Sequence, residues 1–241
     1  MADAAIPITA PAGQDGLAAV DARLLVWLSP AFPVGAFAFS HGLEQAAERG
    51  WLSDRADLEA WLADLVEIGA LHNDLVLLSV AAQATRAANW PALAAVGELA
   101  LALQPSAERH LETVTQGNAF RTTVTAAWPC PALAAPFAAL PGDVAYPVAV
   151  GVAAAAHELA IRPTALAYGV AFVSSLTSAA IRLSLVGQTD AQRIIAMLMI
   201  PLEKAAQRTA SATLDDLGGA SFRSDLASLA HETQYTRLFR S

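Results

Sequence analysis

The sequence predicts an all-α protein, a single-domain bundle of roughly eight to ten helices. Apolar residues recur at three- and four-residue intervals along most of the chain, which is the period of one helix face. No run alternates between apolar and polar residues, as a half-buried strand would. In 241 residues, 55% hydrophobic and 15% charged side chains supply one large core and exclude disorder over the whole chain.

The chain divides into a short tail and one long folded region. Residues 1–20 are expected to form a flexible N-terminal tail, and residues 21–241 the helical domain. A proline-rich break covers residues 128–142, where four prolines prevent a continuous helix. Two smaller domains are an alternative, but the apolar helices after the break need covering, which favours one domain.

The first half contains three clear helix signals. After Asp54, apolar residues from Leu58 to Val76 keep helical spacing and predict an amphipathic helix of several turns. Pro91 suits a first-turn position, because the N–H that proline lacks has no partner there. Ser106, after a proline, can introduce another helix.

The second half has equally specific signals. Pro163 suits the first turn of a long apolar helix. Residues 189–192, Thr-Asp-Ala-Gln, have the form of a capping box, in which the hydroxyl and the amide satisfy exposed backbone donors, and predict a helix start. Pro201 is expected to kink or interrupt that helix, because it removes a backbone donor.

Residues 163–181 are nineteen uncharged residues between two arginines, a length close to what a bilayer requires. Their small and hydroxylated residues fall at helical spacing, which is typical of a helix packed closely against others. Without a second clean span or an aromatic belt, we expect a buried helix of a soluble protein, and a membrane span is the alternative. The N-terminus lacks the features of a secretory signal, so an intracellular chain is expected.

Charge and cysteine content exclude several classes of protein. The chain has 14 basic and 22 acidic side chains, a formal charge of −8, which argues against nucleic-acid binding. The acidic excess lies within residues 1–127, so an electrostatic partner surface would be acidic and N-terminal. Cys130 is the only cysteine, which excludes an intrachain disulfide and a cysteine-pair metal site.

No motif in the sequence predicts catalysis or a metal site. The chain lacks a phosphate-binding loop, a dinucleotide fingerprint, a zinc-protease histidine pair and a nucleophile turn. His41 and Glu44 lie three residues apart and could share a helix face. They are interpreted as a capping or partner-facing pair, and a helical small-molecule-binding or enzymatic domain built on them is the alternative.

Two segments have unusual composition. Residues 28–44 place two prolines and a glycine before an aromatic-rich stretch, which indicates a shaped turn that leads into a helix. Residues 232–241 form a predicted partner-binding tail, with the aromatic and arginine content of binding hot spots. Folding of this tail back onto its own domain is the alternative. The hot-spot residues are Tyr235, Arg237, Leu238, Phe239 and Arg240.

Four motifs in order give the chain a resemblance to the UreF family of urease accessory proteins, from about Leu24 to Ser241. The first and last motifs are residues 29–44 and 231–241, and two shorter ones lie between them. In the first three motifs, some residues are expected to have a structural role. The first motif has Pro30, Pro33, Gly35, Ser40, His41 and Gly42, the second has Tyr146 and Pro147, and the third, which begins at Arg182, has Gly187 and Gln188.

The resemblance implies a cytoplasmic, all-α, dimeric accessory protein of the chaperone type with no catalytic activity of its own. It implies binding of a UreD-type protein, also called UreH, and of a UreG-type GTPase that the protein recruits and regulates. The assembly would then insert nickel into the active site of the urease apoenzyme. No nucleic acid, membrane or directly bound cofactor is expected, and the partners are expected to carry nickel and GTP.

The resemblance also assigns roles to residues. It places the five hot-spot residues of the tail against the UreD-type partner, and Glu44 and Arg182 on the GTPase-facing side. Arg182 could equally form a structural ion pair, and Glu44 could be a first-turn acid favoured by the helix dipole. His41 stands where the family pattern has glutamine, and Leu185 where it often has proline, which affects the expected GTPase-facing surface. Deletion of residues 232–241 is expected to abolish partner capture and leave the helical fold nearly intact.

Overall fold

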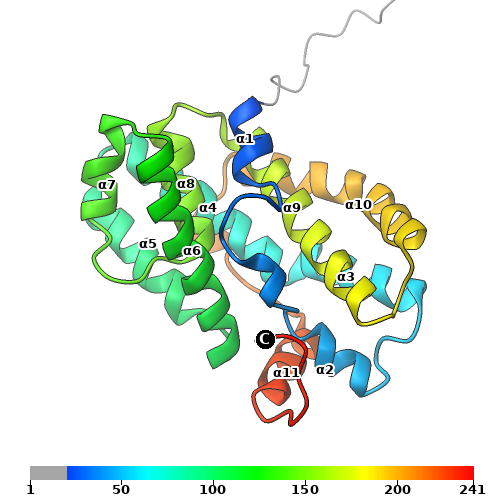
Figure 1. Ribbon diagram of the computed structural model, residues 1–241. Helices are drawn as coiled ribbons and strands as arrows, with labels where there is room; N and C mark the ends of the chain where they lie inside the picture. The colour runs from blue at the N-terminus through cyan, green and yellow to red at the C-terminus, as the bar shows by residue number, and fades with distance from the viewer. Residues whose placement is uncertain (1–20) are drawn as a thin grey trace, which may run out of the picture.

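The computed structural model describes residues 21–241, and the predicted N-terminal tail, residues 1–20, lies outside the described residues. Between residues 21 and 241 the protein is helical and has no strand, which confirms the all-α prediction (Figure 1). Eight of the helices have ten or more residues. The α-helices are α1 (Ala22–Trp27), α2 (Leu43–Glu48), α3 (Arg55–Ile68), α4 (Ala70–Arg86), α5 (Trp90–Ala102), α6 (Ala107–Ala127), α7 (Ala134–Ala138), α8 (Tyr146–Ala156), α9 (Ile161–Arg182), α10 (Gln188–Thr209) and α11 (Phe222–His231), and the 3₁₀ turns are η1 (Ala36–Ala38), η2 (Pro131–Leu133) and η3 (Leu214–Asp216).

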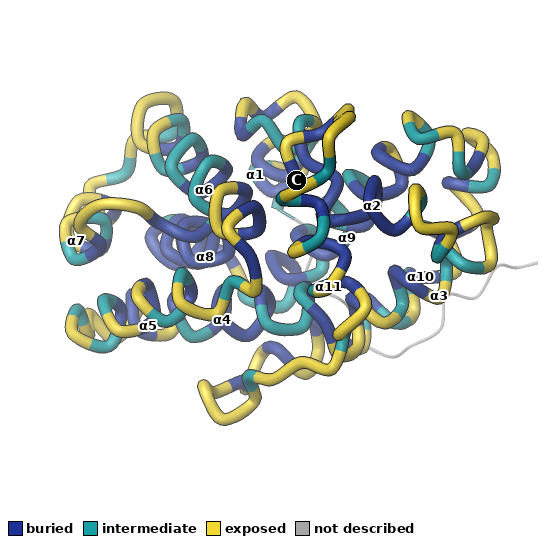
Figure 2. Tube along the Cα trace, turned by 90° about the horizontal axis from the view of Figure 1, so that it is seen from below, coloured by how far each residue is buried: buried dark blue, intermediate teal, exposed yellow. Residues whose placement is uncertain are grey.

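Helices α4 and α8 form the centre of the fold. Helix α8 is buried from Pro147 to Ala156, and in Figure 2 it is almost entirely in the buried colour. At Gly151 the two helices approach so closely that an added Cβ would lie 2.3 Å from the carbonyl oxygen of Leu78 in α4. Only glycine fits there, because the backbone of α4 occupies the space of a side chain. Helices α5, α6 and α7 surround this pair on one side, and α3, α9 and α10 extend on the other (Figure 1).

An aromatic cluster attaches α1 to the rest of the fold. The buried ring of Trp27 meets Phe120, Trp128 and His157 edge-on, with centroid separations of 6.0, 5.9 and 5.0 Å. Such edge-to-face pairs are favourable because the positive ring edge faces a negative π face. The short α1 is therefore held by packing, since a six-residue helix has little stability of its own.

The segment after Asp54 forms two helices rather than the predicted one. Asp54 caps α3 through the N–H of Asp57, but the helix ends at Ile68, and α4 begins at Ala70. Gly69 between them is extended, which frees the carbonyl of Ile68 to accept from Ala220 N at 2.9 Å. The apolar face continues across the break, so helical spacing alone did not reveal it.

The expectations for α10 are partly wrong. The helix begins at Gln188, with Gly187 as its N-cap and no side-chain cap, so the capping box is not formed. Pro201 does not interrupt the helix, which continues to Thr209. The carbonyl left without a donor belongs to Met197, which is 62% exposed, so water can replace the missing hydrogen bond.

The other proline signals are confirmed. Pro91 lies in the first turn of α5 and Pro163 in the first turn of α9, and Ser106 caps α6 by accepting from Arg109 N. The proline-rich break contains η2 and α7 instead of a continuous helix. Leu133 and Leu140 of this segment are buried, so it covers the core.

Within residues 21–241, two stretches are long and apolar enough to cross a membrane by length and composition. In Arg55–Arg86, 61% of the most apolar window is buried in the protein, and Gly69 breaks the stretch into α3 and α4. In Ile161–Arg182, the corresponding fraction is 50%. Packing inside the fold therefore accounts for much of the apolar character of both stretches.

Candidate partner-binding site

The segment that leads into α2 makes a sequence of tight turns. Gly35 (φ 77°), His41 (φ 59°) and Gly42 (φ 81°) have left-handed backbone conformations. Glycine adopts this conformation freely, whereas His41 must be held in it by its surroundings. At Gly42 an added Cβ would also lie 3.0 Å from Ser228 N of α11, so the glycine allows α2 and α11 to pack closely.

The last residues of the chain lie beside this segment (Figure 1). Ser40 N donates to the carbonyl oxygen of Ser241 at 2.7 Å, and Arg240 N donates to Ala38 O at 2.9 Å. The Ser40 hydroxyl donates to the same Ser241 oxygen. Ser241 is buried, so the end of the chain is part of the packed structure.

Glu44 binds the backbone of the C-terminal tail. Its carboxylate accepts from Leu238 N at 2.6 Å and from Phe239 N at 3.0 Å. It also accepts from Nε2 of His231 at 3.1 Å, and His231 reaches Glu108 of α6 through Nδ1 at 2.6 Å. The other oxygen of Glu108 accepts from Arg237 at 2.8 Å. We call Ser40, Glu44, Glu108, His231 and Arg237 the tail junction.

A second buried polar cluster adjoins the tail junction. Arg109 pairs with Glu112 and donates to Nδ1 of His41, and Ser241 Oγ donates to Glu112 at 3.3 Å. Burial would raise the pKa of Glu112, but the Arg109 guanidinium lowers it to about 2. Burial, reinforced by Arg109, lowers the pKa of His41 to about 4. His41 is therefore neutral at pH 7 and accepts from Arg109.

Arg182 connects α9 to the tail. Its guanidinium lies over the ring of Phe239, 4.3 Å from the centroid, and donates to Phe37 O at 2.6 Å. A cation above an aromatic face is held by the ring quadrupole. The partners of Arg182 are thus a ring and a carbonyl, rather than the acid that an ion pair requires.

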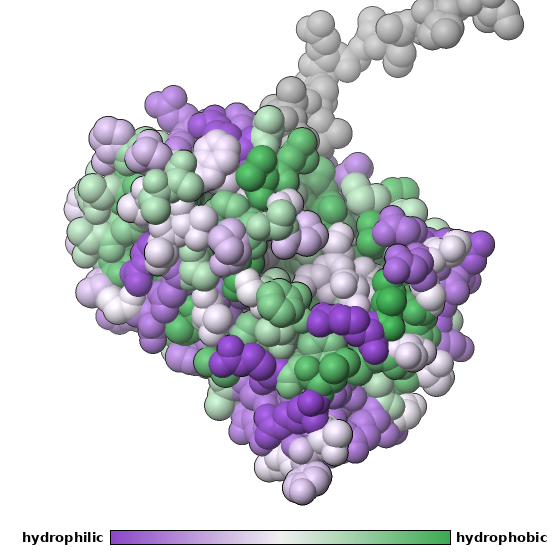
Figure 3. Space-filling model, viewed as in Figure 1, coloured by the Kyte–Doolittle hydropathy of each residue, from purple (hydrophilic) through white to green (hydrophobic). Residues whose placement is uncertain are grey.

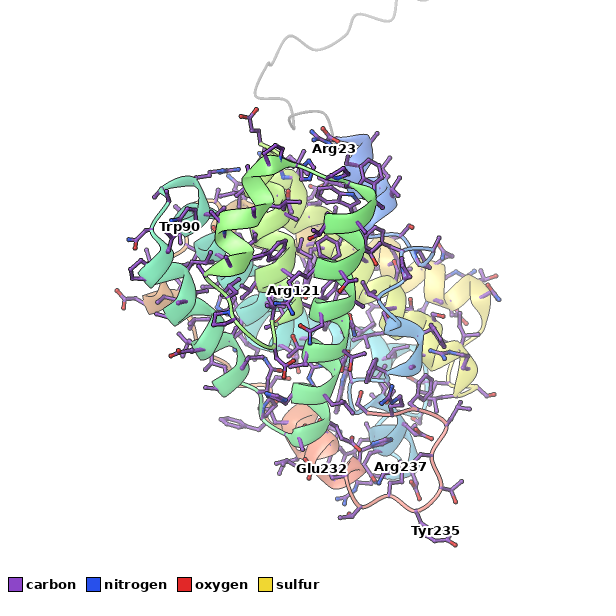
Figure 4. The ribbon with its side chains drawn as sticks, turned by 60° about the vertical axis from the view of Figure 1, so that its left-hand side comes forward. Arg23, Trp90, Arg121, Glu232, Tyr235 and Arg237 are labelled. Atoms are coloured by element: carbon purple, nitrogen blue, oxygen red, sulfur yellow. The ribbon has the colours of Figure 1, made fainter. Side chains whose placement is uncertain are left out.

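The tail residues differ sharply in exposure. Phe239 is 4% exposed, whereas Leu238 is 63% exposed and Tyr235 is fully exposed. In Figure 4, Tyr235 projects away from the body at the tip of the terminal loop, and Arg237 lies between that tip and the helices. The backbone of the tail and the Phe239 side chain therefore fold back onto the domain, as the alternative prediction states. Tyr235 and Leu238 form an apolar surface that nothing in residues 21–241 covers.

A cavity of about 820 Å³ opens beside the second polar cluster, with Arg109 and Glu112 in its lining. One wall is the segment with Pro30, Pro33 and Gly35, the opposite wall is α9, and the floor is polar. Figure 3 shows apolar residues over the middle and upper part of this face, with hydrophilic ones gathered toward the lower end. On the floor, Asp74 accepts from the Tyr168 hydroxyl at 2.8 Å, and burial raises the pKa of Asp74 to about 6.

The remaining predicted positions lie at the starts of α8 and α10 and just after the end of α9. Tyr146 and Pro147 form the first turn of α8, where Tyr146 N donates to Thr113 Oγ1 at 3.0 Å. Gly187 and Gln188 begin α10, and the space around Gly187 is open. Leu185, the second departure from the family pattern, follows the end of α9 and is half-buried.

The paired interpretation of His41 and Glu44 is not what the structure shows. His41 faces Arg109, whereas Glu44 faces the tail, so they do not converge on one ligand. Glu44 does lie in the first turn of α2, as the helix-dipole alternative predicts. Among residues 21–241, no group of three or more His, Cys, Asp or Glu side chains is placed to hold a metal ion.

Sequence reasoning missed the acceptors and donors on α6. Glu108, Arg109 and Glu112 are all buried, although charged residues usually lie on the surface. The available signal was weak: α6 is a long helix with several charged and amide residues in an otherwise apolar protein. His231 and Glu232 are neighbours in the sequence, but their side chains have different partners. They diverge, since Glu232 accepts from Ala107 N at 2.8 Å.

Comparison with known proteins identifies the family. The family model for UreF matches residues 52–199, which is more than half of the chain. The chain belongs to the UreF family. A urease accessory protein UreF of Methylobacterium radiotolerans is 54% identical over 219 residues, covering 91% of this chain and 96% of the relative. Relatives with the same name from Xanthobacter autotrophicus and Azorhizobium caulinodans are 50% and 51% identical, each over 90% of this chain and over 90% and 94% of the relative.

The structure brings three of the four sequence motifs together. The first motif supplies Ser40 and Glu44, and the last supplies His231 and Arg237 of the tail junction. The third motif supplies Arg182, which lies on Phe239. Three motifs that are far apart in the UreF-family sequence therefore meet at one end of the molecule, and the second begins the central helix α8.

Proposed function

We propose that this urease accessory protein bridges a UreD-type protein and a UreG-type GTPase, and so assists nickel insertion into the urease apoenzyme. In this proposal the chain recruits and regulates the GTPase and catalyses no reaction itself. Nickel and GTP are carried by the partners, and the protein acts in the cytoplasm as a homodimer. Family membership supports the general role, and the lack of a phosphate-binding loop in the sequence supports the division of labour.

The observation that carries the proposal is the exposed pair Tyr235 and Leu238 on a tail whose backbone is fixed. Large apolar side chains that are exposed on a rigid support are typical of binding hot spots, because little entropy is lost when a partner covers them. Arg237 and Arg240, beside them, provide charged groups for the rim of the interface. We assign this face to the UreD-type partner.

The GTPase-facing side is proposed to include Arg182 and the end of α9. Glu44 is buried under the tail, so its contribution there is to hold Leu238 and Phe239 rather than to touch the GTPase. Both faces then depend on the same tail junction. Binding at one face is expected to influence the other through the position of Phe239, which lies against Arg182.

Deletion of residues 232–241 is too severe a test of this proposal. Removing Phe239 and Ser241 would expose the core and take from Glu44 and Glu108 the donors that the tail supplies, leaving them only His231, so we expect the deletion to destabilise the fold as well. Point substitutions at exposed positions separate binding from folding. The matched pair is Tyr235→Ala with Leu238→Ala against Met197→Ala with Ile200→Ala, since Met197 and Ile200 are 62% and 64% exposed on α10.

The experiment is light scattering after size-exclusion chromatography of the full chain, alone and mixed with the UreD-type protein and then the nucleotide-loaded GTPase. We expect a dimer that grows stepwise, loss of the first step in the Tyr235/Leu238 variant, and unchanged assembly in the α10 variant. A wild-type chain that ignores both partners would refute the bridging role. Equilibrium dialysis that finds a stoichiometric, submicromolar nickel site on the isolated chain would refute the assignment of the metal to the partners.

A further inference from the structure

The geometry around His231 suits a ring that donates from both nitrogens. This side chain is fully buried at the end of α11, and both ring nitrogens contact carboxylate oxygens. Nδ1 is 2.6 Å from Glu108 Oε2, and Nε2 is 3.1 Å from Glu44 Oε2. An ionised carboxylate only accepts hydrogen bonds, so both nitrogens must donate. A histidine that donates from both nitrogens carries two ring protons and a positive charge.

The two carboxylates that His231 contacts are the ones that hold the tail. Glu44 binds the amides of Leu238 and Phe239, and Glu108 binds the Arg237 guanidinium. His231 lies between these carboxylates and fixes both orientations. The positions of the exposed residues Tyr235 and Leu238 therefore depend on a buried proton.

Charge balance at the tail junction requires the same proton. Helices α2 and α6 contribute two carboxylates, Glu44 and Glu108, and the tail contributes one guanidinium, Arg237. With a protonated His231, the junction therefore has two positive and two negative charges. The further charged groups near this centre are Asp225 of α11, Glu232 just after it, and Arg109 and Glu112 of α6, while Arg240 lies over the ring of Phe39. Arg109 and Glu112 pair with each other. Loss of the imidazole proton would leave uncompensated negative charge and turn one nitrogen lone pair toward a carboxylate.

We propose that His231 is a positioning residue whose second ring proton holds residues 232–241 in the conformation that presents Tyr235 and Leu238. Deprotonation of His231 at alkaline pH loosens this segment and weakens capture of the UreD-type protein. The part of the inference that concerns capture rests on the proposed function. The loosening of the tail is independent of it.

Acid also limits this arrangement, through Glu108. Burial raises the pKa of Glu108, against the opposing effect of His231 and Arg237. Glu108 therefore takes up a proton at less acidic pH than an ordinary glutamate. Once it is neutral, it no longer forms an ion pair with Arg237. The tail is held most firmly while Glu108 is ionised and both ring nitrogens of His231 donate.

The direct test is hydrogen exchange by mass spectrometry on the full chain, from about pH 6 to about pH 9, on either side of histidine titration. Exchange of the 232–241 peptide is divided by its intrinsic rate at each pH and compared with that of an α4 peptide. We expect tail protection to fall about tenfold or more as pH rises, because a charge-assisted hydrogen bond is lost, while α4 protection stays constant.

Two variants separate the proton from the side chain. His231→Gln keeps one donor but cannot become charged, so we expect weak tail protection that no longer varies with pH. His110→Gln removes an exposed histidine from α6 and is the control, with the wild-type pH profile. Far-UV circular dichroism checks that both variants keep the helical fold. Tail protection independent of pH in the wild type, or unchanged in His231→Gln, overturns the inference.

Capture of the UreD-type protein is measured over the same pH range. A parallel loss of tail protection and of affinity supports the whole inference. Affinity that rises as the tail loosens overturns it, because the tail would then need to leave its own domain before binding. If tail protection falls with pH and the partner is captured at no pH, the proposed function fails while the role of His231 in holding the tail stands.

Discussion

The α4/α8 centre and the tail junction are both buried, but different forces stabilise them. The centre consists of alanine, valine and leucine side chains in backbone-to-backbone proximity, and its stabilisation is proportional to apolar area removed from water. The tail junction is a chain of polar and charged side chains that hydrogen-bond to one another and to the backbone of the tail. Apolar packing is insensitive to pH and tolerates partial change. A buried ionic network holds only when every member is present and correctly charged.

This difference separates the framework of the molecule from its adaptable part. A tightly packed centre keeps the helices fixed whatever happens at the tail. A polar junction can be released by a proton or by a partner that offers replacement hydrogen bonds, since its net stabilisation is small compared with its gross interactions. The exposed Tyr235 and Leu238 are attached to the adaptable part, where a recognition surface can respond to conditions.

The largest expected effect is at the centre. Gly151→Ala would place a methyl group 2.3 Å from Leu78 O, so α4 and α8 must separate, at a cost of about 3 kcal/mol or more. Alanine normally stabilises a helix relative to glycine, so a loss of stability in this variant would itself indicate a clash with α4. Gly187→Ala, which meets no neighbouring atom, is the control. Urea denaturation of both variants measures the difference, and equal stability would mean that the two helices are not in backbone contact.

A smaller loss is expected at the tail junction. Glu44→Gln keeps the shape but removes the charge that binds the Leu238 and Phe239 amides and His231, at a cost of about 2–4 kcal/mol. Glu48→Gln, exposed on the same helix, should cost less than about 0.5 kcal/mol. Proteolysis of the tail and urea denaturation together report the change. A Glu44→Gln protein as stable as its control would show that the junction contributes nothing to folding.

Asp74 tests whether the contribution of the cavity floor to stability depends on pH, as expected at the tail junction, or is independent of pH, as expected at the α4/α8 centre. Its native pKa of about 6 exceeds the ordinary 3.8, so the native state binds the proton more tightly than the unfolded state, and stability falls as pH rises from about 4 through 6. Asp74→Asn keeps an acceptor for Tyr168 and removes this loss. We expect a gain of about 1–3 kcal/mol at pH 8 and little change near pH 4. Identical pH profiles for the two proteins would contradict the raised pKa.

The smallest expected effect on folding is at the exposed surface. Leu238→Ala removes a side chain that touches solvent, so the free energy of unfolding should change by less than about 0.5 kcal/mol. Its amide still reaches Glu44, because that contact uses the backbone. Thermal denaturation provides the measurement. A shift of several degrees would show that Leu238 belongs to the packed structure and would weaken its assignment to a partner.

The sequence allowed the helical class, most helix starts and the composition of the tail to be predicted, because these depend on local patterns. Proline at the first turns of α5 and α9 and serine before α6 act within a few residues of themselves. The break at Gly69 was missed because it depends on Ala220, which donates to Ile68 from the other end of the chain. The start of α10 was misplaced because a plausible cap at Thr189 lay two residues past the actual one.

The site was predictable only as separate parts. The resemblance named Glu44, Arg182 and the tail residues, but it placed them on two different partner faces. That Glu44 binds the tail backbone, and that Arg182 covers Phe239, follows from tertiary packing that no spacing rule encodes. Glu108 belongs to none of the four motifs, and the motif that begins at His231 does not show its contact with Glu108, because a buried ion pair is recognised by what surrounds it.

The tail junction also has a place in the order of folding. Its hydrogen bonds join residues 123 to 201 positions apart in the chain, including Glu108 with His231 and Ser40 with Ser241. Contacts of such long range form late, because the entropy of closing the loop must be lost before they stabilise anything. Helices α4 and α8 therefore assemble while the two ends of the chain are still apart. The surface that carries Tyr235 and Leu238 is completed last, so a chain that has not finished folding does not present it.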